Sequence, residues 1–271
     1  MRSKKSNRPS DKDVKAFLDQ RVDLYNDRSF IDNDPICIPH RYSDLRDIEI
    51  SGLWTALLSW GLRKTIINKS GQLFDMMGNE PHRFIMDGSD AEKQTLMKFV
   101  HRTFQPTDTA YFLDFFKRYY TEYETLEEAF AIHATENDSS VKSMLTGFHQ
   151  EFFDSEWAPK RTRKHVATPS RGASCKRLNM FLRWMVRRDN VGVDFGLWKK
   201  ISPAQLMIPL DVHVHRVATA LGLLERKAAD WKSVEELTAK LRGFDASDPV
   251  KYDYALFGVG VIEGQSVVFD T

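Results

Sequence analysis

The sequence predicts an all-α protein. Apolar side chains recur at the 3.6-residue spacing of helices along nearly all of the 271 residues, and no convincing alternating strand pattern interrupts them. Glycine and proline fall between the periodic stretches, where they would end or begin helices. Apolar residues make up 42% of the chain and aromatic residues 12%, so a large core can form. This length suits one large domain or two intimately packed lobes.

The first half of the chain contains five predicted helices. Apolar residues at helical spacing predict a mostly buried helix at 53–60, which Gly61 ends. A second helix covers 66–77 and stops at Gly78. Thr125 and Glu128 have the spacing of a capping box at the start of another helix. That helix covers 125–135, and the other two predicted helices of this half cover 111–123 and 141–153.

The second half begins with a basic connector, 157–170, which carries two prolines. A strongly amphipathic helix follows it. Its core face is formed by Leu178, Phe181, Leu182 and Met185, and its outward-facing arginines are Arg177, Arg183, Arg187 and Arg188. The last three predicted helices cover 212–221, the stretch from the Ser233–Glu236 capping box to Gly243, and 250–257 after an N-cap and proline at Asp248-Pro249.

We expect these helices to form a single two-lobed domain at 13–262 between two tails. Lobe A covers about 44–156, lobe B covers about 13–43 plus 165–262, and the tails are a basic stretch at 1–12 and a C-terminal stretch at 263–271.

The sequence lacks the features of a secreted or membrane protein. No apolar segment follows the basic start, and the most apolar stretch, 50–62, falls short of the ~18 apolar residues that a membrane span needs. Cys37 and Cys175 lie far apart, which suits a reducing compartment and is too few for a four-cysteine iron–sulfur cluster. We therefore expect a cytoplasmic monomer that contacts no membrane and uses no metal or cofactor.

The charge of the chain is unevenly distributed although the net charge is only +1. No acidic residue occurs from Ala158 to Arg188, a window that contains Lys160, Arg161, Arg163, Lys164, Arg171, Lys176, Arg177, Arg183, Arg187 and Arg188. A stretch of one sign suits a polyanion such as nucleic acid. The alternative is a solvated face whose charge the acidic residues of 122–156 balance in space.

The segment Ile-Pro-Leu-Asp-Val-His-Val-His-Arg at 208–216 carries the strongest chemical pattern. Pro209 sets an extended approach to the following helix, and Asp211 is placed to cap its N-terminus. The amides and the dipole of a helix N-terminus hold a carboxylate in a fixed position. A structural cap and a catalytic role for Asp211 are therefore compatible.

This segment resembles the second half of the signature of the helix-hairpin-helix (HhH-GPD) DNA glycosylases. In that superfamily an apolar-Pro-apolar-Asp-x-His-Val-x-Arg-like run supplies the catalytic aspartate. Upstream, the run Arg-Gly-Ala-Ser-Cys-Lys at 171–176 lies where the superfamily has a glycine-rich hairpin and, in bifunctional members, a Schiff-base lysine. The resemblance implies a catalytic pair of Lys176 and Asp211.

The hairpin is degenerate compared with the usual Leu-Pro-Gly-Val-Gly. Only Gly172 is retained, and Ser174 stands where the second glycine belongs. The interval from Lys176 to Asp211 is longer than in common members and is closer to that of the archaeal 8-oxoguanine glycosylase branch. The chain is also similar to a family of bacterial proteins of the same length, which have closely similar motifs and undefined activity.

Two flanking segments extend the resemblance. The stretch 51–60 is similar to the early helix that leads into the loop filling the gap left by a flipped base. Tyr-Ala-Leu-Phe at 254–257 resembles the late helix of the 8-oxoguanine DNA glycosylase/AP lyases, in which Phe257 would stack on the extruded base and Asp253 replaces a base-reading glutamine. The implied base pocket comprises Phe257, Asp253, Met180 and His213, and the implied DNA contacts are Gly172, Ser174, Arg171, Arg177, Arg187, Arg188 and Arg63.

The implied activity is that of a DNA glycosylase with AP lyase activity on an oxidised or otherwise damaged base in duplex DNA. A lysine at a helix start, partly buried among other cations, can attack the sugar C1′ as a neutral amine. A fixed carboxylate then stabilises the cationic sugar. The base must leave the duplex first, so the resemblance implies an aromatic pocket and a residue that fills the gap.

Two other functions fit the same residues. One is a non-catalytic nucleic-acid-binding protein that keeps the fold and needs only the basic face. The other is a metal-dependent hydrolase that uses Asp211, His213 and His215, although residues two apart on a helix point to different faces. Geometry separates these two functions from the glycosylase, because glycosylase catalysis needs the amine of Lys176 and the carboxylate of Asp211 to face one cleft.

Overall fold

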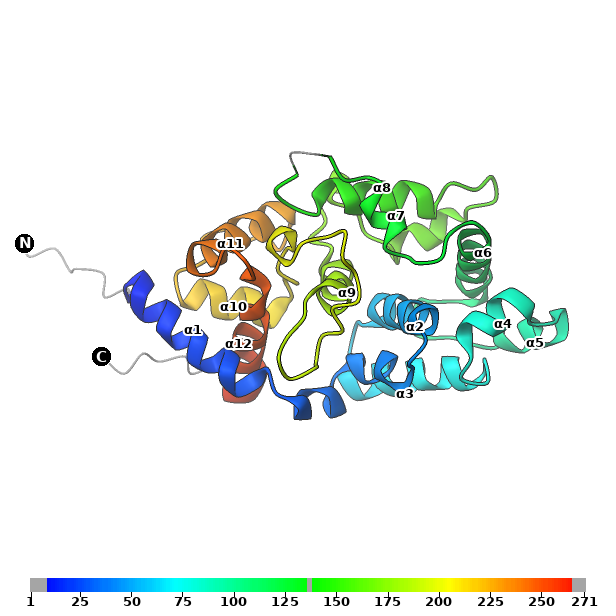
Figure 1. Cartoon of the computed structure of the whole chain (residues 1–271), viewed down its shortest axis with the longest axis horizontal. Coiled ribbons are helices and arrows are strands. Elements are labelled where there is room, and N and C mark those ends of the chain that lie inside the picture. Colours follow the sequence, from blue (N-terminus) through cyan, green and yellow to red (C-terminus); the bar gives the residue numbers. More distant parts are fainter. Residues whose placement is uncertain (1–8, 136–137, 265–271) are drawn as a thin grey trace, which may run out of the picture.

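The computed structural model describes residues 9–135 and 138–264, and within these ranges the protein is all-α (Figure 1). Three isolated bridges are present there but no β-strand forms, so the predicted fold class is confirmed. The expected tails, 1–12 and 263–271, lie mostly outside the described residues. Ser10 accepts a hydrogen bond from the Asp13 amide and caps a helix that begins at Asp11, within the stretch expected to be a tail.

Twelve α-helices form in the described part of the chain. They are α1 (Asp11–Tyr25), α2 (Leu45–Leu58), α3 (Arg63–Asp75), α4 (Pro81–Asp87), α5 (Asp90–Leu96), α6 (Pro106–Glu122), α7 (Glu128–Ala131), α8 (Lys142–Phe152), α9 (Lys176–Val186), α10 (Val212–Ala220), α11 (Trp231–Phe244) and α12 (Tyr252–Gly258). Seven 3₁₀ segments and a π-helix join them: η1 (Arg28–Asn33), η2 (Pro35–Cys37), η3 (Pro39–Arg41), η4 (Lys160–Lys164), η5 (Pro169–Arg171), η6 (Pro203–Gln205), η7 (Pro249–Lys251) and η8 (Val259–Glu263).

Helix α9 lies in the middle of the molecule, between two groups of helices (Figure 1). Helices α1, α10, α11 and α12 gather at one end, where α1 and α10 both pack against α12. Helices α2 to α8 occupy the other side, and α2 packs directly against α9. The start of α9 is therefore set between elements from both ends of the chain.

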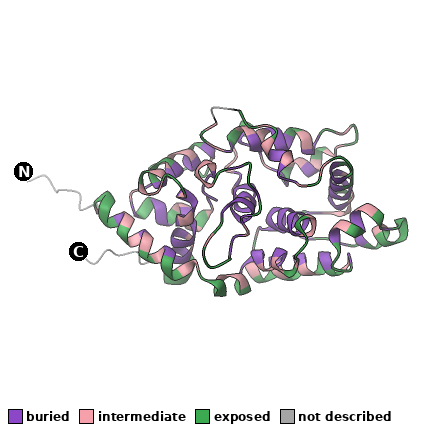
Figure 2. Cartoon of the chain, in the orientation of Figure 1, coloured by how far each residue is buried: buried purple, intermediate pink, exposed green. Residues whose placement is uncertain are grey.

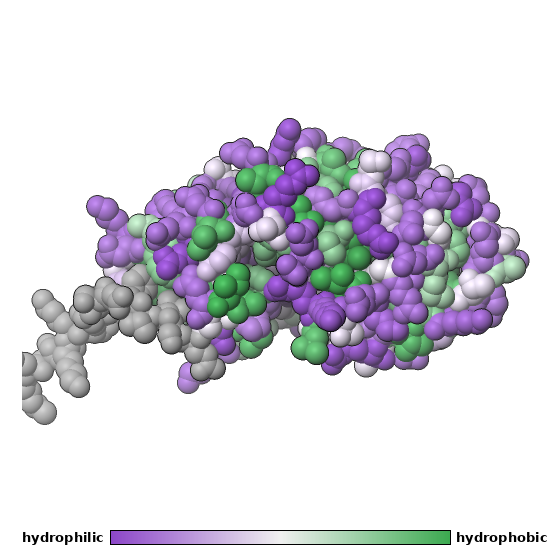
Figure 3. Space-filling view, turned by 90° about the horizontal axis from the view of Figure 1, so that it is seen from below, coloured by the Kyte–Doolittle hydropathy of each residue, from purple (hydrophilic) through white to green (hydrophobic). Residues whose placement is uncertain are grey.

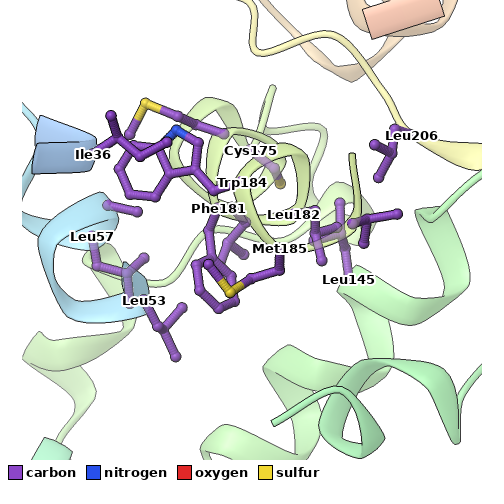
Figure 4. Packing of buried hydrophobic residues seen from close by; sticks show 14 of the residues in the cluster. Ile36, Leu53, Leu57, Leu145, Cys175, Phe181, Leu182, Trp184, Met185 and Leu206 are labelled. Atoms are coloured by element: carbon purple, nitrogen blue, oxygen red, sulfur yellow. The ribbon is translucent and has the colours of Figure 1, made fainter. Parts of the chain in front are cut away.

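Helix α9 is buried on every side from Leu178 to Val186 (Figure 2). Trp184 points toward Ile36, whereas Leu182 faces Leu145 and Leu206 on the opposite side of the helix (Figure 4). A helix that is enclosed all round has no outward face. The prediction of an amphipathic helix with one solvated side is therefore wrong for this segment.

Two of the arginines expected to point outward from this helix are buried instead. Arg183 forms salt bridges with Asp194 and Asp253, and Arg187 with Asp189, Asp194 and Asp248. Burial of a charge is costly unless it is paired, and here several carboxylates pair with each guanidinium. The counterions of these two arginines thus follow the acid-free window in the sequence, whereas Arg161 of the same window pairs with Asp108, and none of these acids lies at 122–156.

Three predicted helix starts differ from the structure because their side chains have other partners. Helix α7 begins only at Glu128, although the Thr125 hydroxyl accepts a hydrogen bond from the Glu127 amide at 3.2 Å while it donates to the Glu49 carboxylate. Asp230, and not Ser233, caps α11. Asp248 binds Arg187 through its carboxylate and makes no side-chain cap.

The sequence pattern missed three helices with sparse apolar positions. Helix α1 buries only Val14, Leu18 and Val22, and the short helices α4 and α5 bury few residues each. None of the described helices is both long and apolar enough to cross a membrane. The face drawn in Figure 3 is mostly hydrophilic, with separate apolar patches among the polar residues.

Candidate active site

One cavity of about 710 Å³ collects side chains from widely separated parts of the chain. Its walls come from the 3₁₀ segments near the N-terminus, the α2–α3 turn, the first turn of α9, the segment leading into α10, and α12. Its lining includes Phe30, Asp34, Trp60, Leu62, Arg63, Lys176, Arg177, Met180, Arg183, Asp211, His213, Asp253 and Phe257. A concave site with a few convergent polar groups is the usual form of a ligand site.

Lys176 is the first residue of α9 and is half-buried in the cavity wall. Its Nζ lies 3.7 Å from the Sδ of Met180, one helical turn further on. Cys175, just before it, adopts a left-handed backbone with φ of 51°, which turns the chain sharply into the helix. Because α9 is enclosed by other helices, the backbone below this amine is firmly held.

The degenerate hairpin before Lys176 still forms a tight turn. Gly172 has a φ of 76°, a conformation that glycine adopts without strain, and its carbonyl accepts a hydrogen bond from the Trp231 amide at 2.9 Å. Ser174 uses its carbonyl to accept from the Nδ2 of Asn179 at 3.1 Å. These bonds tie the turn to α11 and to the first turns of α9.

Asp211 caps helix α10, as its sequence position predicts. Its Oδ1 accepts hydrogen bonds from the amides of His213 at 2.8 Å and Val214 at 2.9 Å. Its Oδ2 has no hydrogen-bond partner among the described residues. The carboxylate thus presents one fixed, uncommitted oxygen in the wall of the cavity that also contains Lys176.

Asp253 is buried in the same cavity and is committed to Arg183, whose Nη1 donates to its Oδ2. Burial raises the pKa of this carboxyl to about 6, with the Arg183 charge opposing the rise and the Asp211 charge adding to it. The charges of Asp211 and Lys176 both act on this pKa, and both residues line the same cavity as Asp253.

Asp34 is a cavity residue that the sequence analysis missed. It is only 7% exposed, and its Oδ1 accepts a hydrogen bond from the Ile36 amide at 3.1 Å. Burial raises the pKa of this carboxyl, against the opposing charges of Arg183, Arg63 and Lys176. An isolated Asp-Pro pair signals only the start of a turn, so no sequence pattern distinguished it.

Phe257 and Trp60 provide the large aromatic surfaces of the cavity. The Phe257 ring meets Phe30 and His213 edge to face, each at 6.3 Å between centroids, and the Arg63 guanidinium lies over it at 4.8 Å. The Trp60 ring has the Arg177 guanidinium over it at 5.1 Å. Each guanidinium makes a cation–π contact and covers one face of its ring, so a planar group could stack only on a face that the guanidinium leaves open.

Leu62 is a second residue that the sequence analysis missed. It is 77% exposed, lines the cavity and immediately precedes α3. Gly61 before it has a φ of 107°, and a Cβ there would lie 2.3 Å from Nη1 of Arg102. The α2–α3 turn therefore needs glycine, and it presents a bare apolar side chain beside the cavity. In the sequence, Leu62 is a single leucine after Trp-Gly, and it belongs to no helical pattern of apolar residues.

The residues implied as DNA contacts differ in how far they are exposed in the structure. Arg187 is 5% exposed and enclosed by carboxylates, so its prediction as a phosphate contact is wrong. Arg177 is half-buried and donates to the Leu57 carbonyl, and burial lowers its pKa to about 10. Arg63 lines the cavity. The cations of the acid-free window that remain exposed are Lys160, Lys164, Arg171 and Arg188.

The histidines give no support to a metal site. The Nε2 of His215 lies 3.1 Å from the Arg226 carbonyl. His213 packs against Phe257 instead of sharing a point with His215. In the two stretches that the structure describes, no three His, Cys, Asp or Glu side chains are grouped so that they could hold a metal ion. The hydrolase alternative therefore lacks a ligand set in this part of the chain.

The fold and the cavity together define an all-α protein with a half-buried lysine amine and a helix-capping carboxylate in one aromatic-walled site. The family described as "Protein of unknown function (DUF2400)" matches residues 34–262, which is most of the chain, and the chain belongs to this family. No curated protein and no solved structure matches the chain. The family description gives no activity, so the function has to be argued from the site.

Proposed function

We propose that this protein is a DNA glycosylase with AP lyase activity, built on a two-lobed helix-hairpin-helix fold with a degenerate hairpin. The observation that carries the proposal is the shared cavity of Lys176 and Asp211, one a half-buried amine and the other a carboxylate with an uncommitted oxygen. Phe257 in the same cavity supplies a surface for an extruded base. These groups match the nucleophile, the electrostatic partner and the base platform that the reaction needs.

The first step is displacement of the base from the sugar. The lone pair of the neutral Lys176 amine forms a bond to C1′ as the C1′–N bond to the base breaks, and the electrons of that bond leave with the base. The departing base takes up a proton, and the nitrogen of Lys176 loses one. Positive charge builds on the sugar as the bond breaks, and the Oδ2 of Asp211 stabilises it.

The second step releases the 3′ phosphate. Opening of the sugar ring converts the C1′–Nζ bond into an iminium, which makes the C2′ proton acidic. Loss of that proton is followed by cleavage of the C3′–O bond, whose electrons leave with the phosphate. Water then hydrolyses the imine and restores the amine of Lys176. Borohydride would instead deliver hydride to the iminium carbon and leave a permanent protein–DNA bond.

Exposed cations and an exposed leucine support a duplex substrate. Lys164 and Arg171 are exposed cations of the segments that precede α9, and the run to which they belong suits a phosphate backbone. In this proposal, Leu62 would occupy the gap that an extruded base leaves in the stack. The side chain of Leu62 would gain its apolar contacts only when DNA is bound.

The test is borohydride trapping on a duplex with a single abasic site. Lys176→Gln removes the nucleophile and keeps length and polarity, so trapping and strand cleavage should disappear. Lys240→Gln, an exposed lysine of α11, is the matched control and should trap like the parent. If Lys176→Gln still traps, another amine is the nucleophile and the proposal fails.

Asp211→Asn tests the carboxylate. Asparagine caps helices nearly as well as aspartate, so the variant should fold normally. The rate of cleavage should fall by roughly 100- to 1000-fold, which is typical for loss of one preorganised electrostatic group. Asp44→Asn changes the cap of α2 away from the cavity and should leave the rate unchanged. If the parent binds duplex DNA but never traps on an abasic site, the protein is a binding module and not a lyase.

A further inference from the structure

Trp157 lies outside the cavity and has no task in the reaction proposed above. It follows α8 in the connector that leads to η4, and it is 47% exposed. Within residues 9–135 and 138–264 it is the one phenylalanine, tyrosine or tryptophan that is exposed. Its ring meets Tyr111 of α6 in a T-shaped contact, with 5.0 Å between the ring centroids. An open tryptophan ring that is held by such a contact is typical of an interface.

Unpaired cations gather near Trp157. The Arg163 guanidinium lies over the Phe153 ring at 4.7 Å, and Phe153 stacks on Tyr111, the residue that Trp157 also contacts. The segment η5, which carries Arg171, packs against α8. Arg161 of η4 pairs with Asp108, whereas in the described part of the chain no ion pair forms at Lys160, Arg163, Lys164 or Arg171.

The environment of His149 indicates that this region is electropositive. His149 belongs to α8, is 7% exposed, and has its ring centroid 4.9 Å from that of Phe153. Its pKa falls to about 4, first through burial and then through the charges of Arg171 and Arg163. Both arginines thus act on the end of α8 that also borders Trp157.

The ring and the charge together favour nucleic acid as the partner. Two exposed acids, Asp154 and Glu156, precede Trp157, but the four unpaired cations outnumber them, which suits a polyanion. The cations also lead toward the cavity, because Arg177 in the cavity wall donates to the Lys164 carbonyl at 3.4 Å. A strand bound along η4 would therefore run between the cavity and the Trp157 ring.

An intact duplex offers this ring no partner, because its neighbours already cover each base on both faces. We propose that Trp157 stacks on an unpaired base of a single-stranded segment beside the damaged site, so that the substrate is DNA at a junction of single strand and duplex. The damaged site in this inference rests on the proposed function, whereas the stacking does not depend on the lyase chemistry. Stacking of bases on aromatic rings beside a basic groove is the usual mode of single-strand binding.

The length of η4 limits how far the single strand lies from the cavity. A 3₁₀ segment rises about 2.0 Å per residue, so Lys160 to Lys164 spans about 8 Å. The three steps from Trp157 to Lys160 add at most about 10 Å. A B-form strand has one phosphate per ~3.4 Å of its axis, so Trp157 lies within about five nucleotides of Lys164. The junction therefore has to be close to the damaged site.

The experiment measures binding by fluorescence anisotropy of one labelled strand. The strand carries a tetrahydrofuran abasic analogue, which lacks the C1′ hydroxyl and cannot form an imine. In one substrate the complement covers the whole strand, and in two others it stops a few base pairs beyond the analogue, on its 5′ or its 3′ side. The parent should bind one of the two junctions about 5- to 150-fold more tightly than the full duplex, which is the range for stacking of one base.

Variants of Trp157 separate stacking from packing. Trp157→Leu keeps apolar bulk against Tyr111 but has no flat face, so it should lose the preference for the junction, as Trp157→Ala should. Trp157→Phe should keep most of the preference. Leu24→Ala changes a side chain of α1 that is 60% exposed, and it should bind all three substrates like the parent. Thermal melts of the four variants should lie near that of the parent.

The charge contribution is tested at Lys160. Lys160→Gln should reduce the log–log salt slope of junction binding by about 0.7, the value for one phosphate of a single strand, and leave the slope for the full duplex unchanged. The inference is overturned if the parent does not prefer either junction, or if Trp157→Leu binds the junctions as the parent does. Equal competition for the junction by polyglutamate would assign the surface to an acidic protein and also overturn it.

Trapping on a true abasic site distinguishes this failure from a failure of the proposed function. Trp157→Leu at saturating concentration should trap on the full duplex within about twofold of the parent, because Trp157 lies outside the cavity. Normal trapping by a parent without a junction preference removes the role of Trp157 and leaves the lyase intact. A junction preference that depends on Trp157, in a parent that never traps, supports the stacking and removes the lyase.

Discussion

Replacement of Glu49 by glutamine should destabilise the protein strongly, although it changes only one atom. Glu49 is buried in α2, and its carboxylate accepts four hydrogen bonds that join α2 to α6, to the segment before α7 and to the loop after α9. The four donors are Tyr120 Oη at 2.9 Å, the Leu126 amide at 3.0 Å, Trp198 Nε1 at 2.7 Å and the Thr125 hydroxyl. All four groups are placed to donate to the carboxylate; burial raises its pKa, and these hydrogen bonds oppose the rise.

Glutamine cannot satisfy this arrangement in either orientation. The amide replaces one oxygen with an NH₂ group. The hydroxyls of Tyr120 and Thr125 can turn to accept from it, but the N–H groups of Leu126 and Trp198 cannot. One buried N–H therefore always faces another donor. The unsatisfied donor and the lost charge-assisted bond together lower the free energy of unfolding by about 3 kcal/mol. For a chain of this size, that lowers the melting temperature by about 6–12 °C.

The assay is urea denaturation followed by circular dichroism, with a thermal melt in parallel. Glu124→Gln is the matched control, because that side chain is 95% exposed and its loss should change the free energy of unfolding by less than about 0.5 kcal/mol. A Glu49→Gln protein that unfolds within that margin of the parent would refute the reasoning, since the carboxylate would then not be carrying these bonds.

Three further predictions follow from packing, burial and charge. Gly258→Ala should lower the free energy of unfolding by about 1–3 kcal/mol, because the new Cβ would lie 2.2 Å from the Tyr25 ring. Gly243→Ala, whose Cβ would lie in open space, should not lower it. Urea unfolding of both variants checks this prediction. Burial lowers the pKa of His149 to about 4, so the unfolded chain binds this proton from about pH 6.5 downward and the folded protein only near pH 4. The free energy of unfolding should therefore fall as the pH drops through that window, and His149→Gln should flatten the fall in denaturation curves taken at several pH values. DNA binding should weaken with salt, and Lys164→Ala should reduce the log–log slope by about 0.9 if that lysine neutralises one phosphate; an unchanged slope in a salt titration would remove it from the interface.

The features that could be read from the sequence were those encoded locally. The helix starting at Lys176 and the cap at Asp211 depend on residues within four positions, and the structure has both. Lys176 and Asp211 also line one cavity, because they stand at the starts of two helices that both contribute to its wall. Local patterns fix where a helix begins, and they fix which residues stand at its first turn.

The features that could not be read from the sequence depend on contacts with residues that are distant along the chain. Arg187 looked like a phosphate contact, and only the fold shows that Asp248 and Asp194 enclose it. Asp34 gave no signal, because η2, which it caps, packs against helices α2 and α3 further along the chain. A run of charges carries no information about where its counterions will come from, and a lone aspartate carries none about its depth.

The enclosure of α9 has a consequence for the motions of the site. Amide hydrogens in a helix with no solvent-facing side exchange only when the whole domain opens, so the α9 amides should report the global free energy of unfolding. Lys176 stands at the first residue of that helix, while Leu62 stands on an exposed turn whose amides can exchange through local opening. One wall of the cavity is therefore rigid and the opposite wall can yield. Slow exchange at α9 beside fast exchange at 59–62 would identify the turn as the part that adapts when a ligand enters.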